Sequence, residues 1–392
     1  MIERLPQTLH ASFLGLLRAS GLPEWCVSLA SALLIIGTLL AVFLLLFALT
    51  SLVERKVIAR IQNRYGPNRV GPFGLLQPAA DGIKMLTKED IVPTGSDRAV
   101  HFLAPIVAVA PALLALAILP YGPGLSPLGL DSGILYYFAV GTAAEIAIFM
   151  AGWAGGSKFP LLGAMRAIAQ MMGYELPLVL SATAAAMVSG SLVPTAIVEA
   201  QAGYVLGILP NWYLFTPWGA VAFLVFFIAA LAESNRSPFD LPEGESEIVA
   251  GHLTEYSGFK YALFFMAEYV GMLAICGIAT ALFLGGWNAP APWLAWIPSW
   301  CWFFAKLYAL VLLMIWVRGT VPRIRIDQLL GFTWKFLLPL AFAALIAAAV
   351  WHHAGRGPAA WILSLLLVGI PYLLLGGAFH RRFPRRTYRF AD

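Results

Sequence analysis

The sequence predicts an all-α integral membrane protein, a polytopic bundle of about nine transmembrane helices in a single domain over residues 1–392. The chain is 60% hydrophobic and 11% charged, and its mean hydropathy of +0.80 is far above that of soluble domains. Nine apolar stretches approach or exceed the roughly 20 residues with which a helix crosses a bilayer. These stretches are apolar on every face, whereas the strands of a membrane β-barrel alternate polar and apolar residues.

The chain begins, in residues 1–26, with a short apolar core flanked by Arg4 and Arg18. No small-residue cleavage site is present, so we do not expect a removed signal peptide. The apolar residues share one helical face, which predicts an interfacial helix on the outer side of the membrane: Leu9, Phe13, Leu16 and Leu17. The predicted spans follow at residues 27–53, 99–119, 133–154, 161–189, 217–233, 260–285, 299–318, 332–351 and 359–379.

The distribution of Lys and Arg predicts the orientation of the chain. Nine spans place the two termini on opposite sides of the membrane. The loops after the odd-numbered spans, with the C-terminal tail, hold all but four of the 25 Lys and Arg residues; the four are Arg4, Arg18, Lys306 and Arg356. The positive-inside rule then puts the N-terminus outside and the C-terminus in the cytoplasm. The basic tail at 380–392 is expected to anchor this orientation on anionic lipid.

Residues that commonly hold cofactors are few and scattered. The three cysteines, Cys26, Cys276 and Cys301, are far apart, so the sequence encodes neither a disulfide framework nor an iron–sulfur or zinc site. His352 and His353 are adjacent, which does not suit haem ligands from facing helices. No phosphate-binding loop or GxGxxG pattern is present. We expect no cofactor or metal on this chain, and the net charge of +5 reflects topology and not nucleic-acid binding.

The first long loop, residues 54–98, has more pattern than a simple connector needs. Its segment RYGPNRVGP predicts a stiff path rich in turns. A cytoplasmic amphipathic helix is predicted next, with Leu76, Ala79, Ala80, Ile83 and Thr87 on one side and Asp81, Lys84 and Lys88 on the other. This helix either anchors the loop in the membrane surface or forms part of the wall of a cavity for a lipid-soluble substrate.

The second long loop, residues 233–260, concentrates acid, since five of the chain's 20 acidic residues lie between Glu233 and Glu247. Asp240, with Pro242 and Glu243 after it, resembles a helix start. The helix predicted there has an apolar stripe of Val249, His252, Leu253 and Tyr256. Its acidic residues would lie on both sides, with Glu243 and Glu247 solvated and Glu245 directed toward the bundle.

Four acidic residues lie within or at the end of predicted spans: Glu145, Glu175, Glu233 and Glu268. A carboxylate in hydrocarbon is costly, so these four must face one another, water or cations. A single such acid could equally be a structural partner between helices, but four on different spans predict a proton path. In the fourth span Arg166, Gln170 and Tyr174 share a face while Glu175 lies opposite Arg166, so this helix can line two compartments.

Four segments, in order, resemble one family: ERKVIARIQNRYGPNRVGPFGLLQPAADGIKMLTKED, LLGAMRAIAQMMGYELPL, LAESNRSPFDLPEGESEIVAGHLTEYSG and ALFFMAEYVG. They are similar to the family of H subunits of bacterial NADH:quinone oxidoreductase, respiratory complex I, and to its mitochondrial relative NADH dehydrogenase subunit 1. The resemblance runs from about residue 30 to the end of the eighth span. It implies a multi-pass protein of the bacterial inner membrane, with the N-terminus periplasmic and the C-terminus cytoplasmic.

The resemblance implies a membrane subunit of a proton-pumping enzyme that is not catalytic alone. It would form the quinone-access tunnel and the start of the proton path between the peripheral and membrane arms. Flavin and iron–sulfur clusters would lie on partner subunits. The implied partners are the peripheral-arm quinone-site subunits, small membrane subunits and antiporter-like neighbours. The implied tunnel residues are Glu54, Arg55, Asp81, Arg236 and Glu245. The implied proton path is Glu145, Glu175, Glu233, Glu243, Glu247, Glu255 and Glu268, with Arg166, Gln170 and Tyr174 in support.

Two alternatives remain open at this point. The anchor subunit of a membrane-bound hydrogenase would use a similar bundle without quinone, although both loops follow the respiratory form. A stand-alone ion transporter would explain acidic residues in the membrane. Such a transporter is expected to show internal repeats and broken helices in matching positions, and no repeat is evident between the two halves of this sequence.

Overall fold

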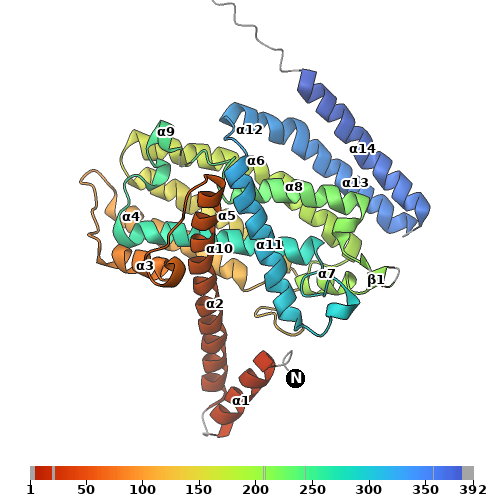
Figure 1. The fold of residues 1–392 in the computed structure, drawn as a ribbon, viewed down its shortest axis with the longest axis horizontal. Coiled ribbons are helices and arrows are strands. Elements are labelled where there is room, and N and C mark those ends of the chain that lie inside the picture. Colours follow the sequence, from red (N-terminus) through yellow and green to blue (C-terminus); the bar gives the residue numbers. More distant parts are fainter. Residues whose placement is uncertain are drawn as a thin grey trace, which may run out of the picture.

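The computed structural model describes residues 5–19, 23–205, 207, 209–242, 244–355 and 357–381. These residues are mostly helical (Figure 1). The helices are α1 (Leu5–Ala19), α2 (Glu24–Ile61), α3 (Gln77–Thr87), α4 (Arg98–Leu116), α5 (Gly133–Ala154), α6 (Lys158–Ser189), α7 (Pro194–Ala200), α8 (Pro217–Glu233), α9 (Glu245–Ile248), α10 (Gly258–Phe283), α11 (Ser299–Thr320), α12 (Ile326–Phe332), α13 (Leu338–Ala354) and α14 (Pro358–Arg381). One short antiparallel hairpin pairs β1 (Tyr204–Val205) with β2 (Leu209–Pro210).

The predicted fold class is confirmed. Within the described residues, eight helices are long and apolar enough to cross a membrane, by length and composition. The run Ile326–Ala354, in which a π-helical turn joins α12 to α13, counts as one of them. The fifth predicted span corresponds to α8, which has only 17 residues. At 1.5 Å per residue α8 is about 25 Å long, somewhat shorter than the roughly 30 Å hydrocarbon layer.

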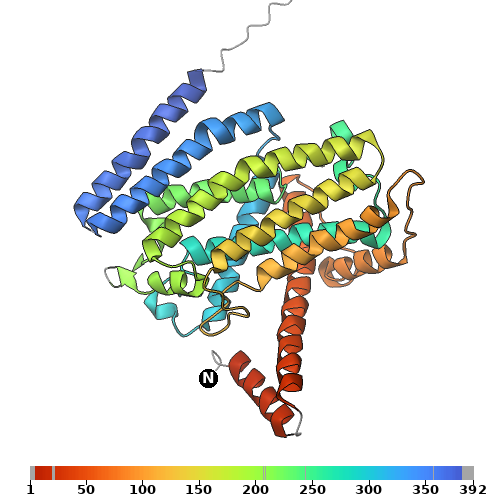
Figure 2. The same cartoon turned by 180° about the vertical axis from the view of Figure 1, so that it is seen from behind.

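The bundle is built around α4, α5, α6, α8, α10 and α13, which pack on one another in the interior. Large side chains fill this core, among them Trp218, Tyr174 and Phe283. Figures 1 and 2 show α2 projecting from the bundle with α1 at its far end, while α13 and α14 form a pair along one flank. The N-terminal part of α2 is therefore left with an exposed apolar surface, which includes Leu29, Leu33 and Ile36.

The first long loop contains the predicted helix. It appears as α3, which follows a 3-10 turn at Pro72–Gly74. No residue of α3 is buried, and Ile83 and Leu86 are exposed. Only the side of α3 that contacts α2 and α10 is covered by the rest of the chain.

The prediction of a helix after Asp240 is wrong. In its place the chain makes turns, the four-residue helix α9 and a 3-10 turn at Gly251–Leu253. Val249 and Gly251 both adopt positive φ angles, which end helical geometry. Val249 is consequently exposed, whereas His252, Leu253 and Tyr256 are buried as the stripe predicted. Glu243 lies outside the described residues, and so does the side chain of Glu245, so its predicted direction has no counterpart here.

This irregular segment lies directly against α6. A Cβ atom added to Gly163 would be 2.6 Å from the Cα of Gly251, so only glycine allows the two backbones to approach this closely. The contact fixes the position of the residues that follow Gly251.

The C-terminal end of α10 is held by a buried lysine. The Nζ of Lys306, on α11, donates hydrogen bonds to the carbonyl oxygens of Leu284 (2.7 Å), Gly286 (2.8 Å) and Asn288 (2.6 Å). The same ammonium lies 4.1 Å from the centre of the Trp212 ring. A cation at a helix C-terminus is stabilised by the carbonyls that have no partner within the helix.

We expect the substitution Lys306→Met to destabilise the protein strongly. Methionine keeps an unbranched apolar side chain but leaves three carbonyls without their donor, and each buried unsatisfied group costs about 1–3 kcal/mol. A loss of about 3 kcal/mol or more in the free energy of unfolding would appear as a lower melting temperature of the purified protein. Lys84→Met, at an exposed position of α3, is the matched control. Equal melting temperatures for the two variants would contradict the structural role of Lys306.

Candidate functional site

Buried charges form a network where α2, α10, α11 and the segment after α8 meet. Glu54 of α2 is only 2% exposed; its Oε1 accepts a hydrogen bond from Nη1 of Arg236 (2.8 Å) and pairs with Arg318. The Nε of Arg236 lies 3.0 Å from Oε1 of Glu268. The guanidinium of Arg236 also stacks over the Tyr269 ring, 4.2 Å from its centre. Two carboxylates thus face two guanidinium groups; Glu54 and Arg236 are buried, and Glu268 and Arg318 are half-buried.

The charges in this network depend on one another. A charged group loses its hydration when it is buried and keeps its charge only if it is paired. Burial acts to lower the pKa of Arg236, but Glu268 and Glu54 outweigh this effect and raise the pKa above its ordinary value. Arg236 is therefore a fixed positive charge, and a change in the charge of either acid acts directly on it.

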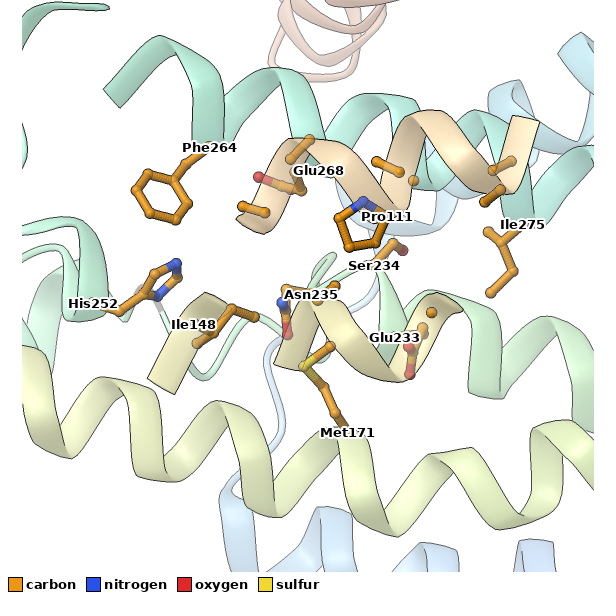
Figure 3. Close-up of a pocket in the computed structure, with 18 of the residues that line it drawn as sticks. Pro111, Ile148, Met171, Glu233, Ser234, Asn235, His252, Phe264, Glu268 and Ile275 are labelled. Carbon is orange, nitrogen blue, oxygen red and sulfur yellow. The ribbon is translucent and has the colours of Figure 1, made fainter. Parts of the chain in front are cut away.

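Beside the network lies a cavity of about 140 Å³ between α4, α5, α6, α8 and α10. Most of its wall is small and apolar, including Ala108, Gly141 and Gly271. Polar groups come from the end of α8, from the 3-10 turn after α9 and from α10: Glu233, Ser234, Asn235, His252 and Glu268 (Figure 3). Tyr137 of α5 also lines the cavity. A water molecule needs roughly 10–15 Å³ for its centre and a few polar partners. The cavity therefore offers room and partners for several waters.

Two of the four acids of the predicted spans line this cavity, and the other two lie on α5 and α6, helices that also contribute to its wall. Glu233 and Glu268 line it. Glu145 on α5 is 9% exposed, and Glu175 on α6 accepts a hydrogen bond from Thr142 (3.2 Å). The charges of Glu145 and Glu175 are close enough to interact with each other and with Glu233. One oxygen each of Glu145 and Glu233 is buried without a hydrogen-bond partner among the described residues, as expected for groups that bind water or a proton.

Glu268 belongs to both arrangements. Its carboxylate pairs with Arg236 of the network, and the same residue lines the cavity together with Glu233. The buried charges around Glu54 and the acids around the cavity are thus two ends of one polar region. The predicted tunnel residues Glu54 and Arg236 lie at one end, and Glu233 of the predicted proton path lies at the other.

The side chains predicted to support the path follow one face of α6. Arg166 pairs with Glu247 at 2.5 Å, Gln170 donates to the carbonyl of Ala232 at 2.8 Å, and the Tyr174 hydroxyl lies 3.4 Å from the carbonyl of Leu329. Glu175 accepts a hydrogen bond from Thr142 on α5, so it contacts a different neighbour from the other three. The hydrogen bond from Arg166 lowers the pKa of Glu247, which is exposed to solvent.

The remaining predicted residues lie away from the cavity. Arg55 and Asp81 form a partly exposed pair at 2.6 Å that ties α2 to α3. Glu255 is half-buried, and its carbonyl lies 3.3 Å from Nε2 of His101. Among the described residues, no group of three or more His, Cys, Asp and Glu side chains is arranged to hold a metal ion.

Three residues of the site have no role that the sequence predicts: Arg318, Asn235 and His252. The sequence marks Arg318 only as a positive charge near a span end, although it pairs with Glu54. Asn235 adopts a positive φ and lies near Gln170, and nothing in the sequence indicates that it faces a cavity. His252 falls in the predicted apolar stripe; it is 6% exposed, and burial lowers its pKa to about 4, so its imidazole is neutral near pH 7.

Comparison with known proteins identifies the family. The NADH dehydrogenase family model matches residues 34–349. The H subunit of NADH-quinone oxidoreductase from Dehalococcoides mccartyi is 52% identical over 296 residues, which cover 76% of this chain and 80% of the relative. The H subunit from Geobacillus kaustophilus is 47% identical over 313 residues (80% and 91%), and an H subunit from Koribacter versatilis is 43% identical over 343 residues (81% and 96%). This chain therefore belongs to the NADH dehydrogenase family, among the H subunits of NADH-quinone oxidoreductase.

Proposed function

We propose that this chain is the membrane subunit of a proton-pumping NADH-quinone oxidoreductase in which quinone approaches its reaction site and proton movement into the membrane begins. The observation that carries the proposal is a chain of ion pairs: Glu54 pairs with Arg236, and Arg236 pairs with Glu268. Glu268 also lines the cavity. The names of the relatives support the enzyme class and its substrate.

The chemistry of quinone reduction fits such a region. Reduction of a quinone to a quinol consumes two electrons and two protons, and negative charge develops when electrons arrive first. In a medium of low dielectric constant such a charge acts strongly on nearby ion pairs. Arg236 and Arg318 would be drawn toward it, which weakens their pairing with Glu54 and Glu268. A carboxylate that loses its cation binds a proton more readily, so the response at Glu268 is proton uptake.

The cavity acids would pass this change onward. Glu268 and Glu233 border the same space, and Glu145 and Glu175 interact electrostatically with Glu233. Neighbouring carboxylates raise one another's affinity for a proton. An acid that gains a proton therefore lowers the affinity of the next acid, which can release its own proton further along the group. Glu247 and Glu255 form the proposed approach from the cytoplasm, with Glu243 and Glu245 in the same acidic loop.

The proposal also assigns a setting. The chain would cross the bacterial inner membrane with its N-terminus periplasmic and its C-terminus cytoplasmic. Its partners would be the peripheral-arm quinone-site subunits, which carry flavin and iron–sulfur clusters as an assembly, and the small and antiporter-like membrane subunits. Arg55 and Asp81 would lie along the quinone tunnel. Copurification with flavin and iron–sulfur subunits, and sensitivity to quinone-analogue inhibitors, tests this setting against a lone transporter and a hydrogenase anchor.

We expect Glu268→Gln and Glu175→Gln to lower coupled quinone reduction and proton pumping by about tenfold or more, because glutamine keeps the shape of the side chain but cannot carry a proton. The measurement is inhibitor-sensitive NADH:quinone turnover and pumping by the whole complex in reconstituted vesicles. Glu199→Gln, at an exposed position of α7, is the control and should keep normal values. Normal turnover and normal pumping in both test variants would rule out the proton path.

The tunnel assignment makes a separate prediction. A photoreactive quinone bound to the complex should label the segments from Glu54 to Asp81 or from Arg236 to Glu247, and excess unlabelled quinone should remove the label. The labelled peptides are identified by mass spectrometry. Competed label found in other segments of this chain, with none in these two, would show that quinone approaches by another route.

A further inference from the structure

His252 occupies an unusual position for a buried histidine. It lies in the 3-10 turn at Gly251–Leu253, outside the spanning helices. Its ring lines the cavity near Phe264 of α10, at the end away from Glu233 (Figure 3). The close contact of Gly163 with Gly251 holds the turn against α6. Val249, in positive φ, redirects the chain just before it. The backbone thus holds this imidazole at the border between the acidic loop and the cavity.

Packing explains why an aromatic ring occupies position 252, but not why that ring is an imidazole. The ring of His252 meets that of Phe264 edge to face, with 6.0 Å between centres, a contact that a phenylalanine could make equally well. The contact with Phe264 gives no role to the imidazole Nδ1 atom. Nδ1 is buried and has no hydrogen-bond partner among the described residues, and a buried polar atom left without a partner is costly. An apolar ring would avoid that cost at this site.

The cavity supplies what the imidazole lacks. Titratable groups line this space from three helices: Tyr137 from α5, Glu233 from the end of α8 and Glu268 from α10. On the side of the loop, Tyr256 follows in the same segment and stacks on His101 of α4, with 4.1 Å between ring centres. Glu255 precedes Tyr256 and is half-buried. Among the described loop residues that line the cavity, His252 is the one with a titratable side chain.

We propose that His252 is a proton-relay residue that connects the acidic loop with the acid-lined cavity. This inference rests on the proposed proton path and adds a member to it. A neutral imidazole has one N–H and one accepting nitrogen. It can accept a proton at the bare nitrogen, become an imidazolium, and release the proton of the other nitrogen into the cavity, toward water that reaches Glu268 or Glu233. The ring is then neutral in its other tautomer, and a turn of the ring restores the first arrangement before the next transfer. With a pKa of about 4, the ring is neutral between transfers.

The test uses His252→Phe and His252→Ala in the whole complex, reconstituted in vesicles. Phenylalanine preserves the ring packing but cannot carry a proton. We expect both variants to assemble and to lose about tenfold or more of their coupled turnover and pumping. Added imidazole should restore a substantial part of the rate in His252→Ala, since the truncated side chain opens onto the existing cavity. Pyrrole, a ring of similar size without a basic nitrogen, should not.

A matched control is His101→Ala, a second buried histidine of the same region that does not line the cavity. Imidazole should leave the coupled turnover of this variant unchanged. Normal coupling in His252→Phe, or equal rescue by pyrrole and imidazole, would overturn the relay and leave His252 a packing residue. If Glu268→Gln and Glu175→Gln are impaired while His252→Phe is normal, only the relay fails; if all three are normal, the proposed path itself fails.

Discussion

The site depends on a single buried cation, the guanidinium of Arg236. It is 4% exposed, and a charge with so little access to water requires carboxylates around it. Glu54 comes from α2 and Glu268 from α10, and Arg318 from α11 balances the second negative charge. Elements far apart in the sequence are thereby brought to one point. One of these carboxylates, that of Glu268, belongs to a residue that also lines the cavity, so the ion pairs and the cavity adjoin.

The acids of the spans follow from the same constraint. A carboxylate inside a membrane protein needs a cation, a hydrogen-bond donor or water, and three of the four acids meet this need in different ways. Glu268 has a cation, Glu175 has a hydroxyl donor, and Glu233 borders a cavity with room for water. The proposed proton path would therefore run through carboxylates with different surroundings.

Much of this molecule could be predicted from its sequence. Long apolar runs located most of the spans within a few residues, because burial in lipid leaves little choice of secondary structure. The positions of Glu145, Glu175 and Glu268 in those runs also predicted that they would need partners. The pairing of Glu54 with Arg318 could not be predicted, since the periodicity of a helix says which face a residue occupies but not which helix lies opposite. The prediction for the segment after Asp240 is wrong for another reason. Val249 and Gly251 adopt positive φ angles, and Gly251 packs closely against Gly163. Such a tertiary contact overrides a helical pattern in the sequence.

The hydrogen bonds of Lys306 at the end of α10, taken together with the ion pair of Arg236, limit how this helix can move. Glu268 and Leu284 are separated by about 24 Å along the helix at 1.5 Å per residue, and each is held by a cation that belongs to another segment. The carbonyl of Leu284 belongs to the backbone, so Lys306 holds the helix itself at that end. Glu268 is attached to Arg236 only through its side chain, which can change rotamer without moving the helix. On the proposed path, a change at the buried charges would therefore reach the cavity as a swing of the Glu268 carboxylate.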